Sequence, residues 1–260
     1  MNNKQWWLKV CKMIGLAMVM GLSLNAHAGL FGFGSTSWKE EALQNDGSTI
    51  LVSRSQSYGG RHEIGQPPPI KEQSLSFTLP GTDKTISWED RTTEDIGHAN
   101  FDLLALHVEN GTPYLVTSPN LCISYNKWGR PNPPYVFFKY DGNAWQRIPL
   151  SEFPADLTNI NLVIQGNEDD LTSHSPITPE GIRKLNSSFV QPEYHFILHA
   201  PTSGRYSNTS CMNLVSDGKG GWLGIDWFTR PGTLDACLQI CNEQHLDNQH
   251  CPCNSLYKGK

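Results

Sequence analysis

A chain of 260 residues, 38% of them hydrophobic, is long enough for one or two packed domains, and its composition excludes the low-complexity and disordered classes. The formal net charge of −5 lacks the basic excess that sequence-blind nucleic-acid binding requires. We therefore expect no nucleic-acid partner.

Residues 1–28 have the pattern of a secretory signal peptide. Three lysines and no acids accompany an apolar run at residues 13–24, and the tripeptide AHA at 26–28 supplies a small-x-small cleavage site. The alternative, a retained membrane anchor, is disfavoured because a spanning helix needs about 20 apolar residues. Cleavage removes three of 20 basic and none of 25 acidic residues, which leaves a formal charge of about −8. The pattern predicts a periplasmic or secreted protein without a membrane span after cleavage.

The chain after the signal is predicted to be rich in β-strands. Residues 29–46 begin with the glycine-rich GLFGFGSTSW and are expected to form a flexible N-terminal segment. Residues 47–230 are expected to form a β-rich domain, because short β-branched or alternating runs at 49–52, 75–79 and 85–88 are separated by Gly and Pro. Asx-Gly turns at 110–111, 141–142 and 217–218 predict three hairpins.

The fold class follows from the spacing of these turns. Propeller blades repeat at a nearly fixed interval, whereas the turn glycines at 111, 142 and 218 are unevenly spaced. We predict a mainly β fold, an antiparallel sandwich or irregular β-sheet domain. One internal helix is expected after the cap Thr178 and the first-turn Pro179, and a short, disulfide-stapled helix is expected near the C-terminus.

Six cysteines follow the signal, and an even number in an exported chain is typical of disulfides: Cys122, Cys211, Cys237, Cys241, Cys251 and Cys253. A helix predicted after Thr233 places Cys237 and Cys241 side by side, so each needs a partner off the helix. We predict that Cys251 and Cys253 are these partners, in either order, and that Cys122 pairs with Cys211. Residues 231–260 would then form a cysteine-rich helical cap.

A metal site is the alternative for the same C-terminal segment. Four thiolates, or a mixture with His245 or His250, are ligands that zinc accepts. The spacings Cys-x-x-x-Cys and Cys-x-Cys only loosely match zinc sites, and an oxidising compartment favours disulfides. No metal ion and no cofactor are therefore expected.

Two stretches combine Gly, Pro, Arg and aromatic residues and are candidates for a binding surface. SYGGRHEIGQPPP covers residues 57–69, and YNKWGRPNPPY covers residues 125–135. Proline holds extended conformations, aromatic rings offer rigid contact area, and guanidinium groups offer forked donors. The predicted binding residues are Tyr58, Arg61, His62, Tyr125, Trp128 and Arg130. The alternative is that both stretches are ordered loops whose aromatic rings cover the core.

No motif predicts catalysis: the Gly-x-Ser-x-Gly elbow, the His-Glu-x-x-His pair and the Walker loop are all missing from the sequence. One acidic stretch offers carboxyl groups and an imidazole, at Glu89, Asp90, Glu94, Asp95, His98 and Asp102. It lacks the EF-hand spacing for calcium, and a solvated acidic loop explains it most simply. A hydrolase of an envelope polymer would need two of these carboxyl groups about 5 to 10 Å apart.

The stretches SQSYGGRHEIGQPPPIKE and YNKWGRPNPPYVFFKYDG resemble a family of exported proteobacterial proteins without an assigned function. The resemblance runs through most of the chain after the signal, including the terminal Cys-Pro-Cys. It implies a setting in the bacterial envelope and no particular chemistry. The hypothesis favoured here is a non-enzymatic binding protein for a protein or cell-envelope ligand, such as an inhibitor or immunity-type protein. A hydrolase using the acidic residues or His98, and a metal-binding protein, are the alternatives.

Overall fold

The computed structural model describes residues 33–60, 62, 64–202 and 210–258. The chain divides into two units, residues 1–32 and residues 33–260. The first unit, with the predicted signal peptide, lies outside the described residues. Among the residues that are described, no helix is both long and apolar enough to cross a membrane.

Four strands form the first sheet, an antiparallel meander in chain order: β1 (Phe33–Leu43), β2 (Thr49–Tyr58), β3 (Ile70–Thr78) and β4 (Thr85–Arg91). Side chains alternate across a strand, so Val52, Leu75 and Ile86 point inward and are buried, while their neighbours in sequence are exposed or half-buried. The strands predicted at 49–52, 75–79 and 85–88 are confirmed in position, apart from Leu79, which follows β3, but each observed strand is longer than the predicted run.

The second sheet is also an antiparallel meander, formed by β5 (Phe101–Glu109), β6 (Thr112–Pro119), β7 (Val136–Tyr140) and β8 (Trp145–Ile148). The predicted turns connect its hairpins. Asn110 and Gly111 both have positive φ, at 50° and 75°, as the tight turn between β5 and β6 requires. At the β7–β8 turn, the Asp141 carboxylate accepts bonds from the backbone N–H groups of Asn143 and Ala144.

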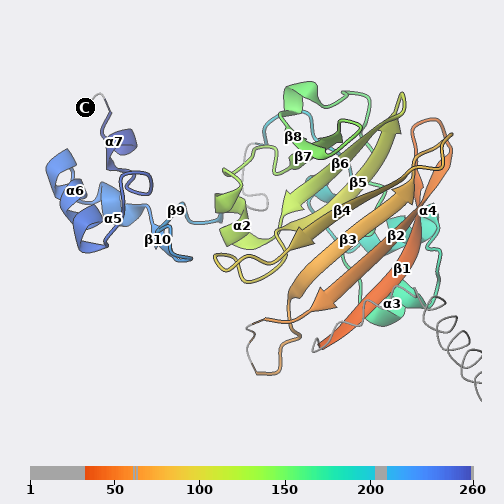
Figure 1. Cartoon of the computed structure of the whole chain (residues 1–260), viewed down its shortest axis with the longest axis horizontal. Coiled ribbons are helices and arrows are strands. Elements are labelled where there is room, and N and C mark those ends of the chain that lie inside the picture. The colour runs from red at the N-terminus through yellow and green to blue at the C-terminus, as the bar shows by residue number, and fades with distance from the viewer. Residues whose placement is uncertain (1–32, 61, 63, 203–209, 259–260) are drawn as a thin grey trace, which may run out of the picture. The chain divides into compact units, whose positions relative to one another are not determined.

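The two sheets form a sandwich, which Figure 1 shows with the first sheet in orange to yellow. Its core combines residues of both sheets: Val52, Leu75, Phe77, Ile86, Trp88, Phe101, Leu103, Leu115, Val136 and Phe138. Each fully buried large apolar side chain contributes about 1.5–3 kcal/mol to stability. The far face of the second sheet is also covered, by a core that includes Phe153, Leu157 and Ile197. Burial on both faces explains why β5 is a nearly continuous apolar run.

The predicted internal helix is confirmed as α4 (Pro179–Asn186), and the Thr178 hydroxyl caps it by accepting a bond from the Gly181 N–H. The prediction of a single internal helix needs correction, because two further helices occur: α2 (Leu121–Lys127) and α3 (Glu168–Thr172). Both are short, so neither shows the apolar periodicity by which a helix is recognised in sequence. Two 3₁₀ turns, Leu150–Glu152 and Pro192–Tyr194, complete this region.

The prediction of a flexible segment at 29–46 is wrong for residues 33–43, which form β1. The inward side chains of β1 include Thr36 and Glu40, and Gln44 follows directly, so apolar alternation does not mark the strand. Glu40 and Gln44 nevertheless have hydrogen-bond partners. The Glu40 carboxylate accepts from Arg54 and from the Val163 N–H, and the Gln44 side chain bonds the backbone of β5.

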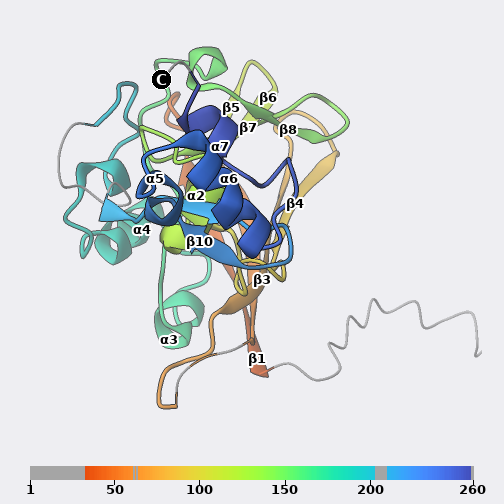
Figure 2. The same ribbon diagram turned by 90° about the vertical axis from the view of Figure 1, so that its left-hand side faces the viewer.

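The C-terminal part contains the third predicted hairpin and three helices: β9 (Leu214–Ser216), β10 (Trp222–Gly224), α5 (Asp226–Thr229), α6 (Leu234–Glu243) and α7 (Cys253–Leu256). Figure 2 shows these helices gathered beside the hairpin. They share one small core around Phe228, to which Val215 and Leu223 of the hairpin also contribute. The cap therefore begins near residue 214, and the boundary predicted at 231 needs correction, because Pro231-Gly232 is a turn within the cap.

Three disulfides are formed, and they follow the predicted scheme. Cys122 is bonded to Cys211, as predicted. Within the cap, Cys237 pairs with Cys253 and Cys241 pairs with Cys251, which decides the order that sequence left open. The predicted helix begins as expected, with the Thr233 hydroxyl accepting from the Ala236 N–H. The cap is thus a helix stapled twice to the segment that follows it.

Candidate ligand-binding groove

The first aromatic residue of the second predicted binding stretch, residues 125–135, points into the protein. Tyr125 lies on α2 and is only 3% exposed, so its predicted role as a surface contact is wrong. Trp128 is half-buried: its Nε1 donates to Asn100 Oδ1 at 3.1 Å, and its ring lies 4.6 Å from that of Phe101. The indole therefore packs mainly against the sandwich core, since aromatic rings at such separations stabilise one another.

Arg130 holds the chain rather than offering a free guanidinium group. It stacks over the Tyr125 ring at 5.0 Å and donates to the carbonyl oxygens of Cys211 and Met212, at 2.9 and 3.1 Å. Asn126 Nδ2 donates to the same Met212 oxygen. These bonds fix the segment that the Cys122–Cys211 disulfide also ties. Arg130 thus holds the start of the cap, and its assignment to a binding surface stays a prediction.

In the first predicted stretch, residues 57–69, the structure describes two of the three predicted binding residues. The Tyr58 hydroxyl, at the end of β2, donates to Gln56 Oε1 at 3.2 Å. His62 is exposed, with Nδ1 3.1 Å from the Gly60 carbonyl oxygen. Arg61 lies outside the described residues. The assignment of Tyr58, Arg61 and His62 to a binding surface stays a prediction.

The acidic stretch divides into exposed and buried groups. Glu89 and Glu94 are exposed, Glu89 forms an exposed ion pair with Arg91, and Asp95 pairs with Lys127 at 3.0 Å. The hydrogen bonds of Asp95 with Thr93 and Lys127, with the lysine's charge, outweigh partial burial and lower its pKa. Such exposed pairs contribute about 0–1 kcal/mol each. Glu94 and Asp95 thus belong to a solvated loop, as the simpler interpretation expected, whereas Glu89 lies on the strand β4.

Asp90, His98 and Asp102 are the buried members of this stretch. The Asp90 carboxylate accepts bonds from the Gln73 and Asn100 side chains and from the Phe101 N–H, at 2.9–3.1 Å. Both Asp90 oxygens thus accept hydrogen bonds within the protein, and these bonds connect β4 to the start of β5. His98 Nδ1 lies 2.7 Å from the Ala99 carbonyl oxygen. Burial raises the pKa of Asp102 to about 6, against the opposing effects of a Gln165 hydrogen bond and the Arg54 charge.

A groove of about 470 Å³ opens beside the second predicted stretch. It lies where β7 and β8 separate beyond their last pair, Phe137 with Ile148. Its lining is mostly apolar and rich in proline: Pro131, Asn132, Pro133, Tyr135, Val136, Phe137, Arg147, Ile148, Pro149 and Leu150. Ligand sites in proteins have this size and this balance, an apolar wall with a few polar groups.

Arg147 is the charged group of the groove, and it is exposed. Its guanidinium lies over the Trp128 ring at 5.4 Å, and one of its nitrogens, Nη2, donates to the Trp128 carbonyl oxygen at 3.1 Å. Stacking on an indole restricts a guanidinium group while its remaining N–H donors stay available. Trp128, predicted as a contact residue, thus restricts the position of the Arg147 guanidinium group.

The proline-rich rim is held in place by its polar neighbours. Asn132 Oδ1 accepts from the N–H and hydroxyl of Thr202, and its Nδ2 donates to the Thr202 carbonyl oxygen. The buried Tyr135 hydroxyl donates to the Glu193 carbonyl oxygen at 2.9 Å, and burial raises the pKa of this phenol above its ordinary range. A preorganised rim reduces the conformational entropy that binding would otherwise cost.

None of the described residues among the six predicted binding residues lines this groove. One wall belongs to the second predicted stretch, through Pro131, Pro133 and Tyr135, whereas the other, with Arg147, Pro149 and Leu150, lies outside both predicted stretches. The sequence RIPL at 147–150 reads as the end of a hairpin strand. Only the pairing of β7 with β8 brings it to the first wall.

The first sheet carries two further hollows, of about 490 and 400 Å³. Short hydroxyl side chains dominate their lining, and Ser53 and Ser76 belong to both. Two such hydroxyls, of Ser55 and Ser74, bond each other at 2.7 Å.

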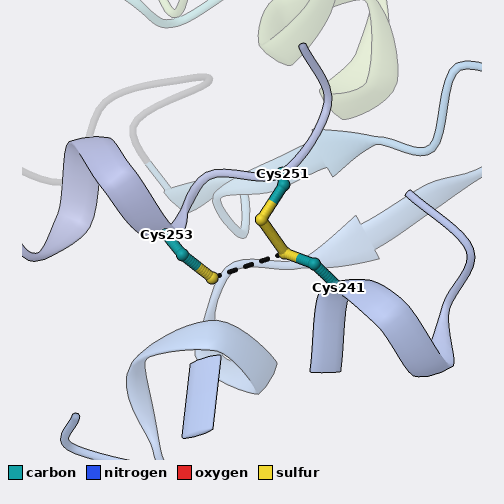
Figure 3. Close-up of side chains that lie close together, drawn as sticks. All are labelled: Cys241, Cys251 and Cys253. Atoms are coloured by element: carbon teal, nitrogen blue, oxygen red, sulfur yellow. Dashed lines mark hydrogen bonds between the residues drawn. A yellow bond between two sulfur atoms is a disulfide. The ribbon is translucent and has the colours of Figure 1, made fainter. Parts of the chain in front are cut away.

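The cysteine cluster of the cap is the candidate metal site, and Figure 3 shows three of its members. The sulfurs of Cys241, Cys251 and Cys253 lie within 4.8 Å of one another. All three belong to disulfides, whereas zinc requires thiolates. His250 Nδ1 is 2.7 Å from Asp247 Oδ1, and that bond helps to lower the pKa of Asp247. The oxidised cap therefore lacks the donor chemistry of a zinc site.

Protein-family models, curated proteins and solved structures were compared with the chain, and none of them matches it. The groove is therefore interpreted from its own geometry. An apolar wall beside one exposed guanidinium group favours a ligand that carries an apolar side chain next to a carboxylate.

Proposed function

We propose that this chain is an exported, non-enzymatic binding protein of the bacterial envelope that holds an extended segment of a partner protein in the groove. The observation that carries the proposal is the position of Arg147, an exposed cation stacked on Trp128 within an apolar, proline-rich wall. The groove supports a segment with an apolar side chain next to Asp, Glu or a terminal carboxylate. An inhibitor or immunity-type protein would recognise its target in this way.

The position of β8 supports a protein segment as the occupant. β8 is the last strand of its sheet and pairs, among the described strands, with β7 alone. An edge strand offers backbone donors and acceptors to an added strand, and side chains of the added strand enter neighbouring pockets. Arg147 and Ile148 belong to β8 and also line the groove.

Export is supported by the signal pattern of residues 1–28 and by the three disulfides. Disulfides persist in the periplasm and outside the cell, whereas the cytosol keeps thiols reduced. The resemblance of two stretches to exported proteobacterial proteins supports the same location. We therefore propose that the protein works in the periplasm or outside the cell.

A hydrolase of an envelope polymer stays the second candidate, and the structure offers it less support. It would need two carboxyl groups facing one substrate. Asp90 is committed to three donors, and none of the six residues of the acidic stretch lines the groove at Arg147. A metal-binding protein would need the cap disulfides to be reduced first.

A displayed library of random peptides tests the proposed function without a known partner. Peptides selected on the full chain are expected to share an apolar residue next to Asp or Glu. Arg147→Glu should weaken their binding at least about tenfold, because hydrogen bonds to charged groups contribute about 1.5–3 kcal/mol. Affinity is measured by titration of synthetic copies of the selected peptides.

Arg91→Glu is the matched control, because Arg91 is an exposed arginine of the first sheet whose partner is Glu89. It should leave peptide binding unchanged. Thermal melts of both variants check that the fold is retained. Selection of peptides without acidic residues, or equal binding by the Arg147→Glu protein, would contradict the proposal.

A further inference from the structure

The two disulfides of the cap are in direct sulfur contact. Cys237 is bonded to Cys253 and Cys241 is bonded to Cys251, yet the Sγ atoms of Cys241 and Cys253 are only 3.4 Å apart. Figure 3 marks this approach with a dashed line beside the Cys241–Cys251 bond. Neither sulfur carries a hydrogen, because each is already in a disulfide. The contact therefore joins sulfur atoms of two different bonds.

The helix α6 and the Cys251-Pro252-Cys253 segment create this contact. Cys237 and Cys241 are one helical turn apart and lie on the same face of α6. Cys253 is bonded to the first and touches the second, so it lies within reach of both. Moving from a Cys237–Cys253 bond to a Cys241–Cys253 bond therefore needs a single displacement at sulfur.

Exposure differs among these four cysteines and decides where an external thiol reacts. Cys237 and Cys253 are 0% exposed and Cys241 is 3% exposed, whereas Cys251 is half-buried. Exchange begins with attack of a thiolate on an accessible sulfur of the disulfide. Cys251 is the cap sulfur that a second molecule reaches first.

We propose that the cap is a site of covalent capture for a thiol-bearing partner, with Cys251 as the point of attachment. The partner's thiolate attacks Cys251 Sγ, a mixed disulfide forms, and the Cys241–Cys251 bond breaks with its electron pair on Cys241. The Cys241 thiolate then attacks Cys253 Sγ, the Cys237–Cys253 bond breaks, and Cys237 leaves as a thiolate that takes a proton from water. The number of disulfides is conserved, so the exchange needs no oxidant or reductant beyond the attacking thiol.

The second step distinguishes capture from simple reduction. In an isolated disulfide, the released thiolate attacks the mixed disulfide again and expels the partner. Here the released Cys241 thiolate instead attacks the neighbouring Cys253 Sγ and becomes part of a new disulfide. The remaining thiol is Cys237, which is fully buried. The mixed disulfide on Cys251 thereby outlives the encounter.

Reduced glutathione is the probe for this inference. The oxidised full chain is incubated with it near pH 8, quenched with acid, alkylated and mapped by mass spectrometry of disulfide-linked peptides. The expected product carries glutathione on Cys251, a Cys241–Cys253 bond and an alkylated Cys237. The exposed Cys122 reacts independently, and its peptides are read separately. Glutathione on Cys251 with an alkylated Cys241 and an intact Cys237–Cys253 bond would overturn the proposal.

The double variant Cys237→Ser, Cys253→Ser provides the matched comparison. It keeps the Cys241–Cys251 disulfide and removes the sulfur that consumes the released thiolate. The amount of glutathione retained on Cys251 should fall at least about tenfold, because Cys241 attacks back. Retention equal to that of the unaltered chain would contradict the proposed second step. An intact mass showing the Cys241–Cys251 bond before treatment establishes that the variant has formed its remaining cap disulfide.

Discussion

The carboxyl group of Asp102, at the start of β5, is buried. It is 9% exposed, and burial, with a smaller contribution from the charge of Asp90, raises its pKa from 3.8 to about 6. The Gln165 side chain donates to it at 3.4 Å, which only partly offsets the loss of hydration. The carboxyl group of Asp102 therefore titrates in the folded protein within the mildly acidic range.

The raised pKa of Asp102 predicts a pH-dependent contribution to stability. The folded state binds this proton more tightly than the unfolded state, so the contribution is complete below about pH 4 and is lost as the pH rises through about 6. Asp102→Asn should remove this dependence and should raise the free energy of unfolding at pH 8 by about 2–3 kcal/mol relative to the unaltered chain. Urea unfolding at pH 4.5, 5.5, 6.5 and 8 measures the difference.

Asp83→Asn is a suitable control, because Asp83 is exposed in the β3–β4 turn. The stability difference between this variant and the unaltered chain should stay nearly constant over the same pH range. A constant difference for Asp102→Asn as well would show that the Asp102 carboxyl group is ionised throughout.

At the scale of elements, β1 is attached by polar contacts as well as by apolar packing. Arg54 on β2 donates to Glu40 on β1 at 2.8 Å, and the side chains are 1% and 0% exposed. Arg54 also stacks on Trp38 at 4.9 Å and donates to the Val163 carbonyl oxygen. On the other side, Ile177 exchanges backbone hydrogen bonds with Lys39 and Glu41, which covers the edge of the sheet.

Removing one partner of this buried pair should be costly. Arg54→Met is expected to lower the free energy of unfolding by about 3–5 kcal/mol, because it leaves the Glu40 carboxylate buried without its cation. The double variant Glu40→Gln, Arg54→Met should recover part of that loss. Chemical denaturation of both variants and of Glu40→Gln completes a double-mutant cycle. Additive effects of the two substitutions would mean that the pair contributes nothing beyond its separate members.

At the scale of the whole molecule, one disulfide and a few side chains connect the cap to the strands. The Cys122–Cys211 bond spans 89 residues of sequence. Arg130 and Asn126 bond Met212, and Trp222 Nε1 donates to the Asp95 carbonyl oxygen at 2.9 Å. The cap has a core of its own with two further disulfides. The long-range disulfide thus joins two parts that each contain a packed core.

The double variant Cys122→Ser, Cys211→Ser tests this connection. Closing so long a loop restricts the unfolded chain, so its loss should lower the free energy of unfolding by about 4–5 kcal/mol in the chain-entropy model. Urea unfolding under non-reducing conditions measures the change. The two cap disulfides should still form, which peptide mapping checks. An unchanged unfolding free energy would mean that the bond adds no constraint to the unfolded chain.

The sequence alone determined those features that neighbouring residues encode. Asx-Gly pairs set the three hairpins, Thr178 and Thr233 set two helix starts, and helical spacing excluded a bond between Cys237 and Cys241. Each of these depends on geometry within a few residues, which propensities and spacing describe directly.

The tertiary structure decided what depends on partners distant in sequence. In β1 the buried Glu40 is bonded by Arg54 and Val163, Gln44 just after the strand is bonded by Leu106, and Tyr125 is buried because α2 lies against the sandwich. Strand pairing likewise brings Arg147 to Trp128 and places β8 beside the prolines, where the groove opens. Burial and ion pairing are set by the side chains that surround a residue in space, and those neighbours are assembled only when the sheets pack.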